Sequence, residues 1–313
     1  MDTVRVISSL SQALTPSAVA LGNFDGLHRG HCKVISALRE FSATQPAHLT
    51  VVAFDPHPQA FFSGQPQLLL TPLAEKVTLL EKLGVEQLVL LKFDQALAQL
   101  SPQEFVDQIL VQQLAARSIS VGFNFGFGRQ RSGTTADLDA IASHYKIPVH
   151  IATPQTAAAQ PISSSAIRTA LLNGQLAPAH HMLGRPYTLT GKVVEGQHLG
   201  ATLGFPTANL KLPDDKFLPR QGVYRVRVTS PQLLQAQPGV MNLGCRPTVD
   251  GTQQVLEVHL LDWSGDLYGH TITVALEQFL RPEQKFDSLE ALKAQIQRDC
   301  EAARSPLPSV APF

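Results

Sequence analysis

Two histidines, His28 and His31, follow a glycine-rich turn and are the clearest candidates for chemistry in the chain. The turn, residues 22–26 (Gly-Asn-Phe-Asp-Gly), comes directly after an apolar run at 18–21 that is typical of a buried strand. From about His28 onward apolar residues recur with helical spacing. Residues at i and i+3 share a helix face. The pattern therefore predicts a strand, a turn and a helix that begins with both imidazoles on one side.

This arrangement suits a phosphate group. The free amide N–H groups and the dipole of a helix start attract anions, and glycine lets a phosphate approach the backbone closely. Histidine adds directional donors whose charge responds near neutral pH. Ordinary surface histidines in a first helical turn are the alternative. The flanking strand and turn supply the context that a short motif needs, and they favour the phosphate site.

Two further stretches of the first half carry polar groups beside predicted elements. Residues 54–58 (Phe-Asp-Pro-His-Pro) leave a predicted strand at 48–54, and their prolines suit a loop fixed around a flat ligand. A rigid turn explains these residues equally well. Ser164 and Ser165 open a predicted helix, where hydroxyls are usually caps. From the same helix face Arg168 offers a forked donor to phosphate.

The second half holds two candidates of a different kind. Thr207 and Asn209 lie two residues apart, so an extended chain points both side chains to one side, as shared contact with a hydrated Mg²⁺ requires. A turn in which both bond only to backbone is the alternative. Glu257 stands in the mostly apolar stretch 255–261. It either faces solvent by strand alternation or acts as a base, and periodicity alone favours solvent.

Composition limits the classes of function. The chain has 313 residues, 44% of them hydrophobic, which suits two globular domains. Lys plus Arg equals Asp plus Glu at 25 each, so there is no overall basic field of the kind expected for nucleic-acid binding. We see neither a leader nor a membrane span. The odd, widely spaced cysteines Cys32, Cys245 and Cys300 form no zinc or disulfide pattern and indicate a reducing cytoplasm.

The elements that must position these residues change type near Leu183. Before it, strands and helices alternate, which predicts a parallel sheet with helices on both faces and ligands beyond the carboxyl ends of the strands. One helix is expected to have Thr71 as its N-cap. After Leu183, short strands separated by Gly- and Pro-rich turns predict an antiparallel barrel followed by one helix to about Arg304. We expect a domain at 1–183, a second at 184–304, and a loose tail at 305–313.

These stretches together resemble the bacterial bifunctional riboflavin kinase/FAD synthetase family. The resemblance covers roughly residues 17 to 304 and rests on many ordered motifs, among them 22–31, 54–58, 162–168, 204–209 and 257–262. It implies a Rossmann-like α/β nucleotidyltransferase domain, the FMN adenylyltransferase, joined to a β-barrel riboflavin kinase. The expected reactions make FMN from riboflavin and ATP, and then FAD from FMN and a second ATP.

The resemblance also implies roles for individual residues. In the first domain it implies an ATP site at Gly22, Asn23, Phe24, Asp25, Gly26, His28, His31, Asn124, Ser164 and Arg168, with His28, His31 and Arg168 catalytic. It implies flavin contacts at Phe54, Asp55, His57 and Pro58. In the barrel it implies that Thr207 and Asn209 position Mg-ATP and that Glu257 is the base on the riboflavin 5′-hydroxyl, against the solvent reading from periodicity. The expected ligands are ATP, Mg²⁺, riboflavin, FMN and FAD, with no nucleic-acid or membrane partner.

Two positions depart from the family pattern. Ala201 stands where the family often has arginine. If that arginine neutralises ATP phosphates, its absence would slow the kinase step or require another cation. Ser165 replaces a threonine and keeps the hydroxyl. Three alternatives remain open: a nucleotidyltransferase whose barrel only binds flavin, a flavin-binding regulator without activity, and an adenylyltransferase for pantetheine phosphate or a nicotinamide nucleotide. The last leaves the barrel unexplained.

Overall fold

The computed structural model describes residues 3–157, 160–196, 199–248 and 251–305. The chain forms two compact units, residues 1–164 and 165–313. Each unit is described by itself. From residue 306 onward, the predicted tail lies outside the described residues.

The first unit is built on a parallel sheet of six strands in the order β1-β4-β3-β2-β5-β6. Every neighbouring pair runs parallel, which confirms the predicted sheet. β1 at the edge is not among the predicted strands. The strands are β1 Arg5–Ile7, β2 Ser17–Leu21, β3 His48–Asp55, β4 Gln87–Lys92, β5 Ala116–Gly122 and β6 Val149–Ala152, with a separate pair β7 Thr156–Ala157 and β8 Gln160–Pro161.

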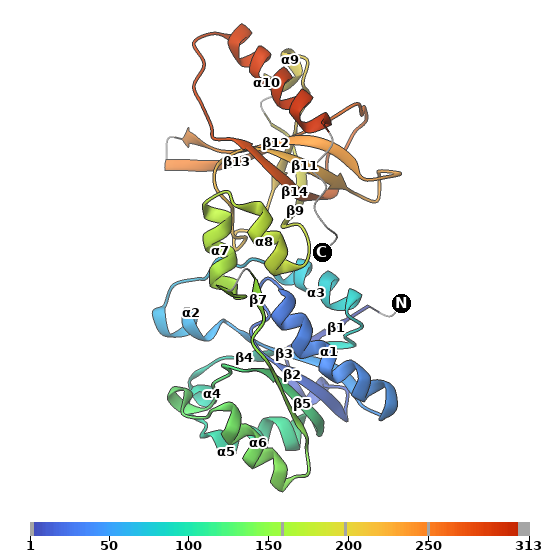
Figure 1. Cartoon of the computed structure of the whole chain (residues 1–313), viewed down its shortest axis with the longest axis vertical. Coiled ribbons are helices and arrows are strands. Elements are labelled where there is room, and N and C mark those ends of the chain that lie inside the picture. Colours follow the sequence, from blue (N-terminus) through green and yellow to red (C-terminus); the bar gives the residue numbers. More distant parts are fainter. Residues whose placement is uncertain (1–2, 158–159, 197–198, 249–250, 306–313) are drawn as a thin grey trace. The chain divides into compact units, whose positions relative to one another are not determined.

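Helices cover both faces of this sheet (Figure 1). Val19 and Leu21 of β2 point into one core, with the helices that follow β4 and β5, while Ala18 and Ala20 point into the other, with α1 and α3. This split follows from the alternation of side chains along a strand. The helices are α1 Arg29–Thr44, α2 Pro58–Ser63, α3 Leu73–Lys82, α4 Gln95–Gln99, α5 Pro102–Glu104 with a π-helical continuation Phe105–Gln113, α6 Thr135–His144, and the 3₁₀ turns Leu10–Gln12 and Arg129–Arg131.

Helix α1 packs against a stripe of small side chains. Ala18 and Ala20 of β2 lie in register with Ser118 and Ser120 of β5, and all four are fully buried. Small side chains allow a helix axis to approach a sheet closely. Val34, Ile35 and Leu38 of α1 fill the core there, as the predicted apolar face requires. The start of α1 is thereby fixed beside the carboxyl ends of β2 and β5.

The expected role of Thr71 as a helix cap is wrong. Helix α3 begins at Leu73 with Pro72 at the cap position and no side-chain cap bond. The Thr71 hydroxyl instead accepts from the Gly26 amide at 2.9 Å. A tertiary hydrogen bond to the glycine-rich turn has replaced the local one that the sequence pattern favours.

The second unit is a closed antiparallel barrel in the order β10-β13-β12-β11-β14-β9. All neighbours are antiparallel, including the closing pair β9 and β10, which confirms the predicted barrel. The strands are β9 Thr188–Val194, β10 Ala208–Lys211, β11 Gly222–Thr229, β12 Gln237–Thr248, β13 Gly251–Leu260 and β14 Thr271–Arg281. The helices are α7 Ser164–Leu172, which starts at the last residue of the first unit, α8 Leu176–Leu183, α9 Leu199–Thr202 and α10 Leu289–Arg304.

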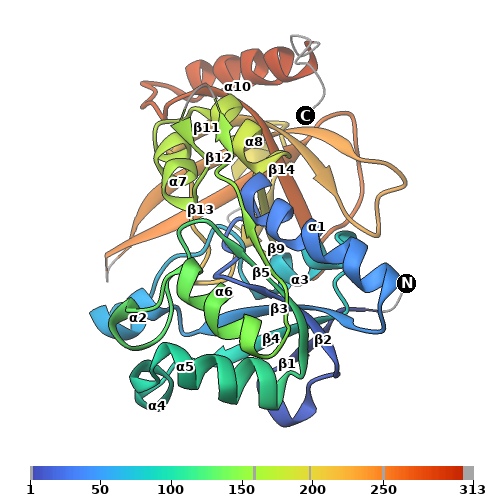
Figure 2. The same ribbon diagram turned by 60° about the horizontal axis from the view of Figure 1, so that its bottom comes forward.

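Helix α10 lies along the outside of the barrel beside β11 and β12 (Figures 1 and 2). Val223 and Val240 of the barrel pack with Cys300 and Ala303 of the helix. The Arg281 guanidinium also donates to the Asp299 carboxylate, with the shortest bond at 2.8 Å. Ser288 caps the helix, because its hydroxyl accepts from the Ala291 amide at 3.1 Å.

Candidate active sites

Three loops with unusual residues meet at one edge of the parallel sheet. The turn at 22–28 follows β2, residues 56–58 follow β3, and Asn124 follows β5. Because β2 lies between β3 and β5 and all three run parallel, their carboxyl ends are neighbours. Ligands of such sheets bind beyond this edge. The structure thus brings together the first-unit loops that the sequence singles out.

His28 and His31 stack on each other at the start of α1. Their ring centroids are 3.7 Å apart and the rings are inclined by 14°. His28 occupies the N-cap position, and its Nδ1 accepts from the His31 amide at 3.3 Å. An accepting Nδ1 leaves the proton of a neutral imidazole on Nε2. Glycine at position 30 leaves room for the His28 ring, because a Cβ there would lie 3.1 Å from it.

We call residues 22–31 the histidine turn, and buried hydrogen bonds hold its glycine-rich part. Asp25, which is 5% exposed, accepts from the amides of Leu70 and Thr71 at 3.2 and 3.1 Å. Ser164 donates its hydroxyl to the Asp25 carbonyl at 2.8 Å. Asp25 therefore shapes the turn, and Ser164 braces it from a distant part of the chain.

The loop at 54–58, which we call the proline loop, is tied to the histidine turn by a side-chain contact. Asn23 Nδ2 lies 2.7 Å from His57 Nε2. His57 is also the N-cap of α2, where its Nδ1 accepts from the Gln59 amide at 3.1 Å. The sequence shows this helix start in Pro58 at the first helical position, although α2 is not among the predicted helices.

An aromatic cluster forms next to the proline loop. Phe54, Phe61 and Phe62 surround Phe93 edge-on, with centroid distances of 5.8, 5.4 and 5.8 Å. Phe62 is 70% exposed. An exposed aromatic group beside a rigid loop is the kind of surface that a flat ring system covers. Sequence reasoning found only Phe54 of these four, because the cluster joins residues from three separate elements.

Two further residues, Asn124 and Arg168, are expected in the ATP site. Asn124 is exposed in the turn after β5, beside the loop of β2. Arg168 lies on α7 one turn after Ser164, in the second unit, with its guanidinium 5.6 Å from the centre of the Phe217 ring. Its place among the ATP contacts stays a prediction.

In the barrel, three polar side chains form a row across adjacent strands. Asn209 of β10 is paired with Glu257 of β13, which is paired with Asn242 of β12. Directly opposed residues of antiparallel strands point to the same face. The neighbours of Glu257 along the strand, Leu256 and Val258, are buried. Alternation therefore places Glu257 outward as periodicity predicts, yet its side chain is half-buried between two amides.

We call Asn209, Glu257 and Asn242 the barrel row. Sequence reasoning missed Asn242 as a site residue, although a lone amide between Met241 and Leu243 of a core strand was a signal for it.

Two glycines fit closely around Asn209 and Thr207. A Cβ at Gly196 would lie 2.0 Å from Asn209 Nδ2, and one at Gly200 would lie 3.2 Å from Thr207 Oγ1 and 2.4 Å from the Phe205 carbonyl oxygen. The loop that carries Thr207 is fixed from β13, where His259 Nδ1 donates to the Pro206 carbonyl at 2.8 Å. Gly196 and Gly200 thus leave the space that the side chains of Asn209 and Thr207 occupy.

Asn209 also lines a pocket of about 700 Å³ in the second unit. Gly196, Lys211 and Lys216 belong to the same wall. The described residues contain no group of three or more His, Cys, Asp or Glu side chains that would hold a metal ion. Mg²⁺ does not need one, because it keeps several waters and commonly binds through one or two protein oxygens together with phosphates. The amide and hydroxyl oxygens of Asn209 and Thr207 fit that mode.

The sequence matches two family models. One describes FAD synthetase and covers residues 10–166, and the other describes riboflavin kinase and covers residues 183–307. The models leave residues 167–182 between them, whereas the compact units divide after Ser164. The predicted domain boundary at 183/184 stays a prediction. In the described residues no helix has the length and apolar character needed to span a bilayer.

Whole-length relatives carry both activities in their names. A protein named bifunctional riboflavin kinase/FMN adenylyltransferase from Escherichia coli K12 is 40% identical over 97% of each chain. Namesakes from Haemophilus influenzae and Bacillus subtilis are 38% and 36% identical, over 97% and 92% of this chain and 99% and 91% of theirs. A solved structure titled macrolide-efflux protein from Streptococcus pneumoniae is 32% identical, with a TM-score of 0.86 over 96% of this chain and 99% of that one.

Proposed function

The chain belongs to the family of bifunctional riboflavin kinases/FMN adenylyltransferases, and from this premise we propose which residues carry each reaction. The enzyme phosphorylates riboflavin with ATP to FMN and adenylylates FMN with a second ATP to FAD and pyrophosphate. Adenylyl transfer is assigned to the histidine turn and riboflavin phosphorylation to the barrel row. The observation that supports this division is that the stacked histidines and the carboxylate belong to different compact units.

For adenylyl transfer, the FMN phosphate oxygen attacks the α-phosphorus of ATP, and the bond to the β-phosphate oxygen breaks to release pyrophosphate. His28 and His31 donate to the ATP phosphates as negative charge builds on them, from a helix start that favours anions. Asn124, Ser164 and Arg168 complete this site in the proposal. One well-placed donor contributes roughly 3–4 kcal/mol, and enzymes lower barriers by about 8–23 kcal/mol, so alignment of the two substrates supplies much of the rest.

The proline loop is proposed to hold the flavin. The resemblance implies flavin contacts at Phe54, Asp55, His57 and Pro58. The adjoining aromatic cluster supports this assignment with exposed ring surface at Phe62. An isoalloxazine ring covering Phe62 would stack on an aromatic face. The contact between Asn23 and His57 then brings the flavin loop and the ATP turn to one place.

For riboflavin phosphorylation, Glu257 is proposed to take the proton of the riboflavin 5′-hydroxyl as the oxygen attacks the γ-phosphorus of ATP and ADP leaves. Its half-buried position between Asn209 and Asn242 supports this role, because flanking amides orient a carboxylate. Thr207 and Asn209 would hold Mg²⁺ together with ATP phosphate oxygens. The ion would neutralise phosphate charge there.

The setting of the enzyme is proposed from its substrates and thiols. ATP, riboflavin, FMN and FAD are its ligands, and none requires a nucleic-acid or membrane partner. Cys32, Cys245 and Cys300 form no disulfide bond, as is expected of thiols in a reducing cytoplasm. A cytoplasmic location and the absence of other partners stay predictions.

One pair of variants tests the assignment. Purified wild type, Glu257→Gln and His31→Ala are each incubated with ATP and Mg²⁺ and either riboflavin or FMN, and the flavins are resolved by chromatography. Glu257→Gln is expected to form no FMN from riboflavin yet to convert added FMN to FAD at close to the wild-type rate. His31→Ala is expected to accumulate FMN and lose FAD formation.

Each variant controls for the other because both reactions are read in the same preparation. Loss of both activities in either folded variant would contradict the division into two sites. Repeating the wild-type assay after chelation of divalent cations tests the metal, and undiminished FMN formation without them would exclude a role for Mg²⁺ at Thr207 and Asn209.

A further inference from the structure

Lys76 is a buried lysine that the proposed mechanism does not use. It lies in the first turn of α3, only 8% of its surface is exposed, and its Nζ donates to the Asn23 carbonyl at 3.1 Å. Lysine is almost never buried unless its ammonium has partners, because removing the charge from water is costly. A side chain kept here despite that cost is a candidate for function.

Asn23 connects Lys76 to both substrate loops. The residue belongs to the histidine turn, directly after Gly22, and its side-chain amide lies 2.7 Å from His57 Nε2 in the proline loop. Because His57 Nδ1 already accepts from the backbone of α2, the neutral ring carries its proton on Nε2. If the Asn23 side-chain amide is rotated by 180°, its Oδ1 takes the place of Nδ2 and accepts a hydrogen bond from His57 Nε2. Asn23 thus orients His57 through its side chain while Lys76 holds its backbone.

The segment that leads into α3 braces the same turn at further points. The Gly26 amide donates to the Thr71 hydroxyl, and Asp25 accepts from the backbone of Leu70 and Thr71. These bonds fix the middle of the turn. Lys76 adds a hydrogen bond at Asn23, where the turn meets the proline loop, and it brings a positive charge, whereas the other contacts are made by backbone amides, a hydroxyl and the Asp25 carboxylate.

We propose that Lys76 is a positioning residue for adenylyl transfer, which acts through Asn23 on the histidine turn and on His57 at once. The ammonium holds the Asn23 carbonyl and adds a fixed charge behind the turn where ATP phosphates are expected to bind. This inference rests on the proposed placement of adenylyl transfer at the histidine turn. Lys76 would set the ATP and flavin loops relative to each other before either substrate binds.

A purely structural lysine predicts a different result. If Lys76 only stabilised the fold, its loss would lower the free energy of unfolding and the active fraction of the enzyme. The Michaelis constants of the remaining active molecules would not change, since they do not depend on enzyme concentration. A positioning residue changes those constants and kcat together.

The test compares Lys76→Met, Lys76→Arg and Lys82→Met, the last being an exposed lysine of the same helix. For each, kcat and KM are measured for ATP and FMN in adenylyl transfer, with the riboflavin kinase rate of the same preparation as internal standard. Lys76→Met is expected to lower kcat/KM by roughly 30-fold or more and to raise KM for both substrates. Lys76→Arg should recover most of this loss, and Lys82→Met and all kinase rates should match wild type.

A double variant tests the route through Asn23. Lys76→Met combined with His57→Ala should lose less than the product of the two single losses, because both act on one contact. Multiplicative losses, unchanged KM values, or an arginine variant as impaired as the methionine one would each overturn the proposal. Should Lys76→Met fail to fold, Lys76→Gln, which keeps a donor without the charge, is judged by the same criteria.

His31→Ala, assayed in parallel, separates this proposal from the assignment of the site. If His31→Ala retains adenylyl transfer, the assignment to the histidine turn fails, and the inference about Lys76 fails with it. If His31→Ala is inactive and Lys76→Met behaves like wild type, only the role of Lys76 is refuted.

Discussion

At Gly196 the absence of a side chain decides where a functional amide can stand. The glycine lies beside Asn209, and an added Cβ would be 2.0 Å from Nδ2 and 2.4 Å from Cγ of that residue. The obstructing atoms are the end of a side chain that can rotate, whereas at Gly200 the obstruction includes the Phe205 carbonyl. A methyl group at 196 therefore displaces Asn209 with little damage to the barrel backbone.

Gly196→Ala is expected to lower kcat/KM of riboflavin phosphorylation by roughly 100-fold, the cost of losing one well-placed polar contact to reacting phosphates. FMN adenylylation in the same preparation should remain at the wild-type level. Combining the change with Asn209→Ala should cost nothing beyond Asn209→Ala alone, because both remove the same contact. A kinase rate near wild type for Gly196→Ala would show that Asn209 does not need its present position.

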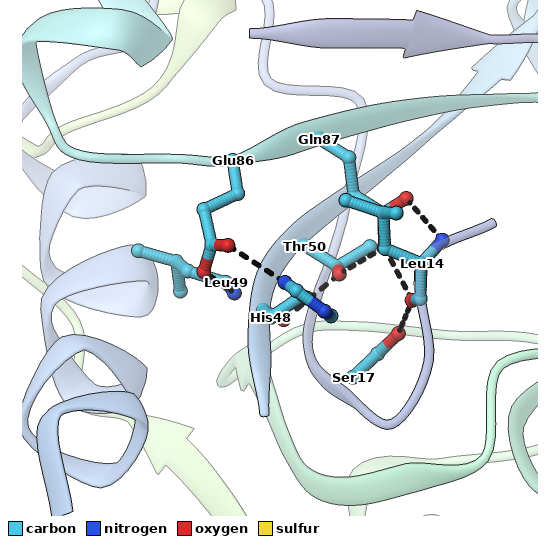
Figure 3. A network of polar contacts seen from close by, with 7 residues as sticks. All are labelled: Leu14, Ser17, His48, Leu49, Thr50, Glu86 and Gln87. Carbon is cyan, nitrogen blue, oxygen red and sulfur yellow. Dashed lines mark hydrogen bonds and ion pairs between the residues drawn. The ribbon is translucent and has the colours of Figure 1, made fainter. Parts of the chain in front are cut away.

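At the scale of elements, the two edges of the parallel sheet have different tasks. The carboxyl ends of the strands carry the histidine turn and the proline loop, while the amino ends carry a polar network that anchors the chain (Figure 3). Gln87 at the start of β4 is fully buried and makes two bonds to the backbone of Leu14, at 2.8 and 2.9 Å, and one to Thr50 at 2.8 Å. It fixes the segment that leads into β2.

Gln87→Leu is expected to lower the free energy of unfolding of the first unit by about 2 kcal/mol, because it leaves the Leu14 amide without its acceptor in a partly buried place, whereas the Leu14 carbonyl keeps the bond from the Ser17 hydroxyl at 2.8 Å. His48→Ala in the exposed half of the same network is the matched control. It removes a pair with Glu86 whose side chains are 37% and 47% exposed, and such surface pairs contribute at most about 1 kcal/mol. Amide hydrogen exchange in β2, β3 and β4 measures the effect of each variant. Equal losses of protection in Gln87→Leu and His48→Ala would contradict this prediction.

Features set by local sequence patterns could be predicted, whereas features that depend on contacts between distant residues could not. The apolar face of α1, with Val34, Ile35 and Leu38, is a local pattern, and the helix forms where that pattern indicates. The barrel row is not local, since Asn209 and Glu257 become neighbours only through the pairing of β10 with β13. Thr71 fails as a predicted cap for a related reason, because its partner Gly26 is remote in sequence.

At the scale of the whole molecule, the proposed division into two sites makes each reaction the control for the other. The two units also allow the stability of one unit to be followed by itself, because Trp263 is the sole tryptophan and lies in the second unit. That unit contains a histidine in an unusual setting. His180 of α8 is 5% exposed, and burial lowers its pKa from 6.5 to about 4 although the nearby Glu277 carboxylate acts in the opposite direction.

Glu277 is not available to His180 alone. Its two oxygens accept from Arg225 at 2.9 Å and Arg227 at 2.7 Å, and its side chain is 10% exposed. Arg225 in turn donates to the Ser305 carbonyl at the end of α10. A proton on His180 would therefore add a third positive charge around one carboxylate inside the packing of α8 on β14.

The pKa of His180 makes the second unit sensitive to acid. The unfolded chain takes up a proton near pH 6.5 and the folded one only near pH 4, so between these values the unfolded state binds more protons. The free energy of unfolding should thus be highest above pH 6.5 and fall by roughly 3 kcal/mol as the pH drops toward 4. Urea unfolding followed by Trp263 fluorescence at several pH values measures it. In His180→Leu this part of the fall should vanish, whereas exposed His181→Gln should keep it; parallel curves for His180→Leu and wild type would show that another group causes the acid sensitivity.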